Sequence, residues 1–187
     1  EVFHRICNLM ETQLGYSFMK HIANSAGISR FKEYHFNCVR LGLGLYGYSG
    51  VLEDQKHLQN TVTLKSIITQ LKNVKKDETI GYNRTFVAKN DMKIAIVPIG
   101  YADGFPKELS NGKGSMIVLG KKCPVVGKIC MDMSMIDVTG LDVQEEDEVI
   151  IYNDENNLNL ISQAINKSPY ELLTAISKRV QRIYIRD

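Results

Sequence analysis

Residues 115–139 read SMIVLGKKCPVVGKICMDMSMIDVT, and this stretch decides the fold class of most of the chain. Its first half places two apolar, β-branched runs on either side of Gly120-Lys121, which predicts a hairpin that turns there. Its second half, residues 128–139, predicts a further strand. Short strands separated by turn residues at this spacing are typical of a β-barrel or a β-sandwich.

The same pattern extends to both sides of this stretch. Residues 61–74 are rich in β-branched side chains, and their apolar phase shifts between Leu64 and Ile67, which indicates a bulge. Residues 92–100 (MKIAIVPIG) and 147–153 (DEVIIYN) predict two further strands. The sequence therefore predicts a mainly β domain.

The C-terminal part contains two helical segments. Residues 158–166 (LNLISQAIN) predict one short helix. Ser168 and Glu171 form a capping box with Pro169 at the first helical position, which predicts the start of a second helix. Residues 179–187 (RVQRIYIRD) predict a strand that closes the chain.

The first part of the chain follows a different pattern. Residues 3–14 carry apolar side chains at helical spacing. Residues 17–25 and 37–47 predict two strands, joined by a helical piece over residues 28–34, which describes a parallel β/α unit. Because such strands are buried on both faces, two of them cannot form a stable core alone.

These patterns predict a mainly β fold: a C-terminal β-barrel-like domain with two short helices, preceded by the last strands of a truncated β/α (TIM-type) barrel. We expect residues 1–50 to be the C-terminal remnant of that barrel and residues 51–60 to be a polar linker. Residues 61–187 form the complete β domain in this interpretation. The chain begins at Glu1, and the simplest explanation is that it is cut from a longer parent.

Composition excludes several classes of protein. The 187 residues include 23 Lys and Arg against 21 Asp and Glu, a net charge of +2, which lacks the basic excess of a nucleic-acid-binding protein. No apolar run is long enough to span a bilayer, and no signal peptide is recognisable. We therefore expect a cytoplasmic protein that does not bind nucleic acid and has no membrane segment in this chain.

Cysteine and histidine spacing argues against a metal site. No CxxC or HxxxH pattern occurs, and each cysteine has an apolar residue beside it, as expected for buried thiols in a reducing compartment. The residues concerned are Cys7, Cys38, Cys123 and Cys130, with His4, His21, His35 and His57.

Two clusters lie where the first two predicted strands end. If both strands belong to a β/α barrel, Ser25 and Gly42-Leu43 lie at its C-terminal face, where a hydroxyl and backbone N–H groups can bind phosphate. The alternative is that Ser25 caps a helix and that the glycines allow close strand packing. Arg40 lies inside an apolar strand, which requires either a polar cleft or a defined partner.

Three further clusters lie in the β-rich part. Taken singly, each has an ordinary interpretation: a surface aromatic residue at a turn, a Gly/Asp turn, and a buried strand with one capping Asp. They are IGYNRTF (80–86), PIGYADG (98–104) and GKICMDM (127–133).

Taken in order, with ANSA (23–26), VRLGLGLYG (39–47) and ISKRVQR (176–182), these motifs resemble the C-terminal part of bacterial alanine racemase from about residue 17 onward. The resemblance implies a pyridoxal-phosphate (PLP) isomerase that interconverts L- and D-alanine for peptidoglycan of the cell wall. It also implies a head-to-tail homodimer, in which the barrel of one subunit and the β domain of the other form each active site.

The resemblance implies roles for eight residues. Ser25, Gly42 and Leu43 match groups that bind the cofactor phosphate, and Arg40 matches the Arg that faces the pyridine nitrogen. A fixed cation there makes the ring a weaker electron sink, which limits side reactions. On the β domain, Tyr82 matches the catalytic base that acts across the dimer. The substrate-binding matches are Met131 and Asp132 near the substrate carboxylate, and Tyr101 at the narrow access to the site.

Other positions match less closely. The residues expected along the access corridor are Lys107, Lys128 and Ile176. The family's Schiff-base Lys, on the first barrel strand, has no counterpart here, nor do the supporting barrel Arg and His. We therefore expect the chain alone to be inactive and unable to attach PLP covalently. Lys178 stands where some relatives have a phosphate-binding Tyr, and Asn83 stands where many have Gly.

Three alternatives remain at this point. One is a serine or broad-specificity racemase of the same fold. Another is the racemase half of a fusion, either with a peptidoglycan ligase or behind a membrane domain. The third is not an enzyme: it is a β-barrel module that survives as a dimerisation or ligand-binding domain.

Overall fold

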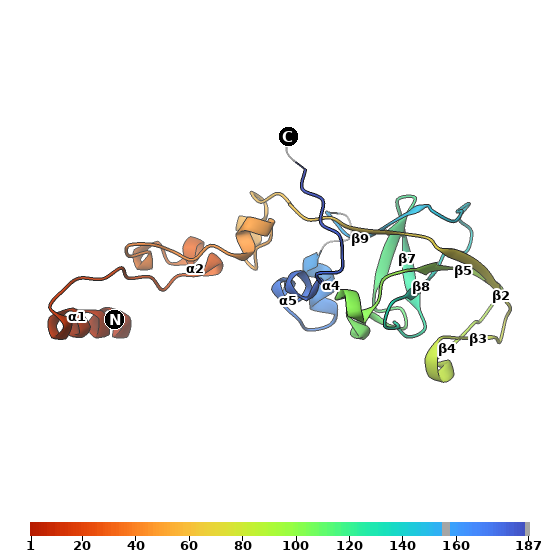
Figure 1. Ribbon diagram of the computed structural model, residues 1–187, viewed down its shortest axis with the longest axis horizontal. Helices are drawn as coiled ribbons and strands as arrows, with labels where there is room; N and C mark the ends of the chain where they lie inside the picture. Colours follow the sequence, from red (N-terminus) through yellow and green to blue (C-terminus); the bar gives the residue numbers. More distant parts are fainter. Residues whose placement is uncertain (155–157, 186–187) are drawn as a thin grey trace. The chain divides into compact units, whose positions relative to one another are not determined.

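The computed structural model describes residues 1–154 and 158–185. The chain divides into two compact units, residues 1–61 (unit 1) and residues 62–187 (unit 2). Within the described ranges, no helix is long and apolar enough to cross a membrane. Figure 1 shows that unit 1 consists of short helices and loops, whereas unit 2 is built around a strongly curved sheet.

Unit 2 is organised by a seven-stranded antiparallel sheet whose order is β1-β9-β6-β7-β8-β5-β2. β1 and β2 lie at opposite ends of this order, although only Ile68 and Thr69 separate them. The sheet must therefore curl until its two ends meet, as in a barrel. The strands are β1 (Leu64–Ile67), β2 (Gln70–Val74), β5 (Met92–Val97), β6 (Ser115–Val118), β7 (Lys121–Val126), β8 (Ser134–Asp137) and β9 (Glu148–Tyr152).

Hydrogen bonds at the two-residue junction show how the sheet closes. The Ile68 N–H donates to Asp147 O, beside β9, over 2.9 Å. The next amide, Thr69 N–H, donates to Ile96 O on β5, also over 2.9 Å. One continuous stretch of chain thus pairs with β9 through β1 and with β5 through β2, which confirms the barrel-like domain. The register shift between Leu64 and Lys65 confirms the predicted bulge at the start of this stretch.

The hairpin of residues 115–126 turns one residue earlier than predicted. Val118 pairs with Lys121, so Leu119 and Gly120 form the turn, with φ of 48° and 72°. A two-residue hairpin turn with positive φ at both positions twists as the flanking strands do. The strand predicted over residues 128–139 is shorter than expected: residues 128–133 form a loop, and β8 begins at Ser134.

Two helices and a small hairpin complete unit 2. They are α4 (Leu158–Ala164), α5 (Pro169–Ala175), β3 (Thr79–Ile80) and β4 (Phe86–Val87). The capping box is confirmed: Ser168 Oγ accepts from the Glu171 N–H, and the Glu171 carboxylate accepts from the Ser168 N–H.

The predicted closing strand is wrong for residues 179–185, which form no strand; residues 186–187 lie outside the described part. The Arg182 guanidinium instead donates to backbone oxygens of its own segment, those of Ile176, Ser177 and Val180.

Unit 1 begins with a helix and continues in short helical turns. The helix predicted over residues 3–14 is confirmed, because it spans Val2–Leu14. The elements are α1 (Val2–Leu14), α2 (Ser25–Arg30), η1 (Lys32–Tyr34), η2 (Leu43–Tyr46) and α3 (Leu52–Gln55).

The two strands predicted in unit 1 are not formed. Their segments do run in parallel, but the backbone–backbone bonds between them are limited to those from Asn37 N–H to Lys20 O (3.1 Å) and from Arg40 N–H to Ala23 O (2.9 Å). Two isolated parallel segments lack the neighbouring strands and covering helices that such strands need.

Residues 51–60, expected as a linker, include α3, belong to unit 1 and bond to its preceding residues. The Gln55 side chain donates to Gly47 O (2.9 Å) and accepts from the Ser49 N–H (2.8 Å). Gly47 has φ of 80°, and a Cβ on it would lie 1.9 Å from Gln59 O. Only glycine therefore allows this approach.

The cysteines are only partly as expected. Cys7 and Cys123 are buried, whereas Cys38 and Cys130 are half-buried, and all four thiols are free.

Candidate functional site

A pocket of about 570 Å³ in unit 2 gathers residues from three separate motifs. Tyr82, Tyr101 and Met131 all line it, although they are far apart in the sequence. Lys107 and Lys128, two of the residues expected along an access corridor, line the same pocket. No ion pair of either lysine is found in the part of the chain that the structure describes, so the pocket has a positive lining.

Tyr82 is held on an unusual loop. Gly81, which precedes it, has φ of 75°, and a Cβ there would lie 3.2 Å from the backbone nitrogen of Lys128. Asn83 and Arg84, which follow it, also have positive φ, 59° and 51°. Asn accepts this left-handed backbone better than other non-glycine residues. Asn83 can therefore occupy a backbone conformation that favours glycine. The Tyr82 side chain is 69% exposed.

The loops that carry Tyr101 and Met131 are bonded to each other. The N–H of Tyr101 donates to Cys130 O (3.1 Å), and the N–H of Ala102 donates to Met131 O (3.0 Å). A Cβ on Gly100 would lie 2.3 Å from Met131 O, so the PIGYADG motif requires glycine at this position. The two loops therefore form one rigid wall of the pocket.

Lys107 is held above the Tyr101 ring, with Nζ 3.8 Å from the ring centroid. This cation–π contact orders both side chains at the side of the pocket. Ser110, which the sequence analysis missed, also lines it. Its hydroxyl accepts from the Ile129 N–H and donates to Lys107 O, so it joins two loops of the pocket. No sequence signal marks Ser110, because it lies in an ordinary turn.

Arg179 is a second residue that sequence reasoning missed as a site component. Its Nε donates to Asp103 Oδ1 over 2.6 Å, and its Nη2 donates to Asp132 Oδ1. Burial raises the pKa of Asp103, but the Arg179 guanidinium and the Gly100 N–H outweigh this effect and hold the pKa below its usual value. The ISKRVQR motif contained the signal, since Arg179 is one of its motif positions.

Two of the residues expected at this site, Asp132 and Ile176, do not line this pocket. Asp132 is held by Arg179 beside it. Ile176 lies near Gly104, whose Cβ would be 2.8 Å from the Ile176 nitrogen. Lys178 is exposed.

In unit 1 the structure brings Ser25 and Gly42 together. The Ser25 hydroxyl accepts from the Gly42 N–H over 2.9 Å. Ser25 is not the helix cap that the alternative interpretation assigned to it, because Asn24 Oδ1 takes that role by accepting from the Gly27 N–H. Arg40 is exposed rather than buried in a strand, and its Nη2 donates to Ile22 O over 3.1 Å. Leu43 begins η2, directly after Gly42.

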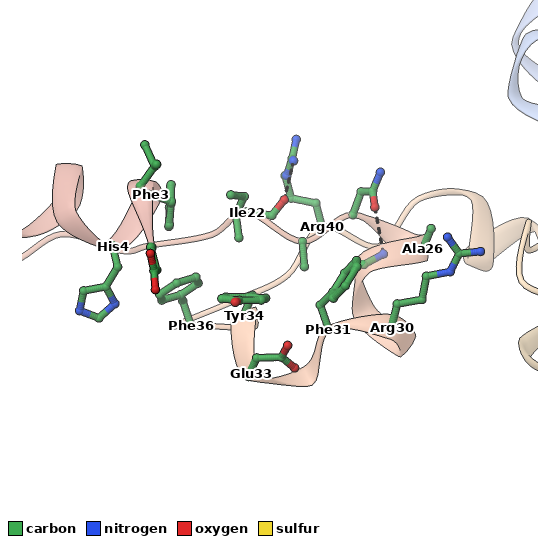
Figure 2. A pocket seen from close by; sticks show the side chains of 15 residues that line it. Phe3, His4, Ile22, Ala26, Arg30, Phe31, Glu33, Tyr34, Phe36 and Arg40 are labelled. Carbon is green, nitrogen blue, oxygen red and sulfur yellow. Dashed lines mark hydrogen bonds between the residues drawn. The ribbon is translucent and has the colours of Figure 1, made fainter.

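A larger pocket, about 830 Å³, lies on unit 1 (Figure 2). Its lining is mostly apolar, and the rings of Phe31, Tyr34 and Phe36 follow one another along it. Polar side chains such as Arg40 lie at its margin. This arrangement is typical of an apolar face that lacks a cover, so size alone does not make it the candidate site.

No group of three or more His, Cys, Asp and Glu side chains that could hold a metal ion is found among the described residues. The two lysines that line the pocket of unit 2 suit an anionic or zwitterionic ligand.

Comparison with known proteins decides the family. The alanine racemase C-terminal domain family matches residues 61–184, and the alanine racemase N-terminal domain family matches residues 1–50. The chain belongs to the alanine racemase family. Alanine racemase 1 of Oceanobacillus iheyensis is 41% identical over 99% of this chain, which covers 51% of that protein. The chain thus spans about half the length of this curated relative.

Solved alanine racemase structures resemble the chain closely. The alanine racemase of D-cycloserine-producing Streptomyces lavendulae has a TM-score of 0.90 and 31% identity over 98% of this chain and 50% of that one. The Bartonella henselae alanine racemase, solved with covalently bound pyridoxal phosphate, has a TM-score of 0.81 and 33% identity over 97% of this chain and 52% of that one. The fold assigned to unit 2 therefore agrees with that of the family.

Proposed function

We propose that this protein acts as a PLP-dependent alanine racemase, which interconverts L- and D-alanine and so supplies D-alanine for peptidoglycan in the cytoplasm. The observation that carries the proposal is the pocket of unit 2. Tyr82, Tyr101 and Met131 line it together with two lysine side chains. A small amino acid presents a carboxylate and an α-proton, and this pocket offers groups for both.

Racemisation requires that the α-proton leaves one face of the carbon and that a proton returns on the other face. Tyr82 carries a hydroxyl at an exposed position of the pocket, where its Oη can hold or deliver that proton on one face. Met131, through its backbone N–H, and Asp132 lie at the carboxylate end. Tyr101, ordered by Lys107, narrows the access and so favours a small side chain.

The donor set of unit 1 fits a phosphate. Ser25 accepts from the Gly42 N–H, which leaves its own hydroxyl proton available as a donor. A hydroxyl and neighbouring backbone N–H groups are the donors that a cofactor phosphate requires, and the Gly42 N–H, which here donates to Ser25 Oγ, would donate to the phosphate instead when it is bound. In this proposal Ser25, Gly42 and Leu43 hold the phosphate, and Arg40 faces the pyridine nitrogen.

PLP, when bound, withdraws electrons from the substrate α-carbon. An Arg40 guanidinium beside the ring nitrogen disfavours protonation of that nitrogen, so the withdrawal is moderate. The protein residues then decide where protons move. The Schiff-base Lys of the family has no counterpart within residues 1–187, so another segment of polypeptide must supply it.

We further propose a homodimer in which unit 2 of one subunit acts on the substrate that the partner subunit binds. The support is the family resemblance, together with the separation of functions between the units. Phosphate-type donors lie on unit 1, and the Tyr82 pocket lies on unit 2.

Tyr82→Phe tests the proposed function in the protein expressed from its complete reading frame. We expect racemisation of alanine to fall by about 10²–10⁴-fold, because the proton-carrying hydroxyl is removed, while PLP remains bound. Coupled assays of D-alanine formation and the cofactor absorbance measure the two effects. Tyr170→Phe, on an exposed part of α5, is the matched control and should retain full activity. Full activity of Tyr82→Phe would refute the assigned role.

A further inference from the structure

Arg179 connects two loops of the pocket through one guanidinium group. Nε donates to Asp103, two residues after Tyr101 on the PIGYADG loop, and Nη2 donates to Asp132, the residue after Met131 on the GKICMDM loop. Asp103 is buried and also accepts from the Gly100 N–H over 2.8 Å. Arg179 thus bonds to one carboxylate on each of the two loops that carry the pocket residues Tyr101 and Met131.

The geometry requires an arginine. A guanidinium presents several N–H groups in one rigid plane, and two of them can reach different carboxylates at once. A lysine ammonium is a point charge on a flexible stem. It could approach Asp103 or Asp132, but it would not fix the distance between them.

The charge of the cluster is also relevant to an amino-acid substrate. Asp103 and Asp132 together carry two negative charges, and Arg179 compensates one of them. In the proposed function, Asp132 lies at the end of the pocket that receives the substrate carboxylate. An uncompensated Asp132 would repel that carboxylate.

We propose that Arg179 is a positioning residue of this site: by bridging Asp103 and Asp132, it fixes the Tyr101 and Met131 loops and allows the pocket to accept a carboxylate. This inference rests on the proposed function and extends it to a residue that does not line the pocket. The backbone bonds from Tyr101 to Cys130 and from Ala102 to Met131 join the same two loops. Solvent exchange of these two amides therefore measures whether Arg179 holds the loops together.

The first test measures the loops directly in the 187-residue chain. In Arg179→Gln, we expect the Tyr101 and Ala102 amides to exchange with solvent at least tenfold faster, while amides of β5 exchange as in the wild type. Arg182→Gln is the matched control. Arg182 belongs to the same motif, but within the described ranges its guanidinium bonds to backbone oxygens of its own segment, so these amides should be unaffected. Unchanged Tyr101 and Ala102 exchange in Arg179→Gln would overturn the proposal.

The second test separates positioning from general destabilisation, in the protein expressed from its complete reading frame. For Arg179→Gln we expect KM for alanine to rise about tenfold, with kcat within about threefold of the wild type. A merely structural loss would lower the active fraction, and therefore kcat, without changing KM. Arg179→Lys should recover only part of the KM effect.

L- and D-alanine are mirror images with an equilibrium constant of one, so kcat/KM must change equally in both directions. This equality checks the measurement internally. If the wild type racemises alanine and KM of Arg179→Gln is unchanged, the role of Arg179 is refuted but the proposed function stands. If the wild type does not racemise alanine, the proposed function itself fails, and the exchange experiment still decides whether the bridge holds the loops.

Discussion

Unit 1 and unit 2 belong to one chain but differ in how much of their apolar surface they bury. Among the described residues of unit 1, the buried apolar side chains are those of Cys7, Ala23 and Tyr48. Unit 2 buries apolar residues from every strand of its seven-stranded sheet and from both α4 and α5. Burying one large apolar side chain contributes about 1.5–3 kcal/mol. The difference therefore predicts that only unit 2 contains enough core to fold alone.

The two units also differ in how their hydrogen bonds are satisfied. Unit 2 closes its sheet within its own sequence, so each strand finds its partners there. In unit 1 the parallel segments around Lys20 and Asn37 share two backbone bonds and stop. The comparison teaches that sheet closure, rather than local sequence, separates a self-sufficient unit from one that depends on further polypeptide.

Cutting the chain between the units should produce the largest effect. Residues 62–187 alone are expected to unfold cooperatively and to give a dispersed NMR spectrum, because their core and closed sheet are intact. Residues 1–61 alone are expected to lack cooperative unfolding, because so few of their side chains are buried. A cooperative thermal transition for residues 1–61 would break the comparison.

Gly100→Ala should have the next largest effect, in unit 2. The new Cβ would lie 2.3 Å from Met131 O and 2.4 Å from Cys130 O, and both are backbone atoms. We expect the free energy of unfolding to fall by roughly 3 kcal/mol or more, because backbone must shift. Denaturant titration measures this loss.

Gly50→Ala in unit 1 is the matched control for this substitution. A Cβ at Gly50 meets no atom within 4 Å, so stability should change little. Equal losses in the two variants would remove the contrast in packing between the units.

Asp103→Asn should have a smaller effect, and the effect should depend on pH. Because the pKa of Asp103 is lowered in the folded protein, its carboxylate contributes stability above the ordinary pKa of about 4. That contribution is lost as pH falls through the lower, folded-state pKa. We expect the variant to be less stable at pH 7 by about 1–3 kcal/mol, the cost of losing bonds to a charged group. The two proteins should converge in acid.

Asp91→Asn is the control for this pH effect. Lys75 also lowers the pKa of Asp91, but both side chains are exposed, and exposed ion pairs contribute little. Urea unfolding at a series of pH values measures both variants. A difference between wild type and Asp103→Asn that does not vary with pH would contradict the interpretation.

Tyr152→Phe should have the smallest effect. The Tyr152 hydroxyl is buried and has no hydrogen-bond partner among the residues that the structure describes, so its removal should change stability at pH 7 by less than about 1 kcal/mol or increase it. Burial raises the pKa of Tyr152. The phenol therefore costs no stability below its ordinary pKa of about 10. Above that pH the unfolded chain ionises more readily than the folded one, so the free energy of unfolding falls as pH rises.

Alkaline unfolding of the wild type and Tyr152→Phe tests this prediction. The variant should lose less stability than the wild type above about pH 10, because it has no phenol to ionise on unfolding. A large loss of stability at pH 7 would show instead that the hydroxyl has a partner.

Local sequence determined those parts of the fold whose physical cause is local. The capping box at Ser168 and Glu171, the helix over residues 2–14 and the hairpin around Gly120 each follow from side chains close in sequence. The order of the motifs identified the family and named Tyr82, Tyr101 and Met131. Their roles remain predictions that the proposed experiments test.

Tertiary structure decided which segments find partners. Residues 17–25, 37–47 and 179–185 have strand-like patterns but form no strands. A strand requires a ladder of hydrogen bonds to another segment, and these segments do not form one. Neither the closure of the sheet through Ile68 and Thr69 nor the bridge of Arg179 between two distant carboxylates could be predicted from local pattern. An apolar pattern reports that a side chain prefers burial, but only the folded chain shows which groups meet there.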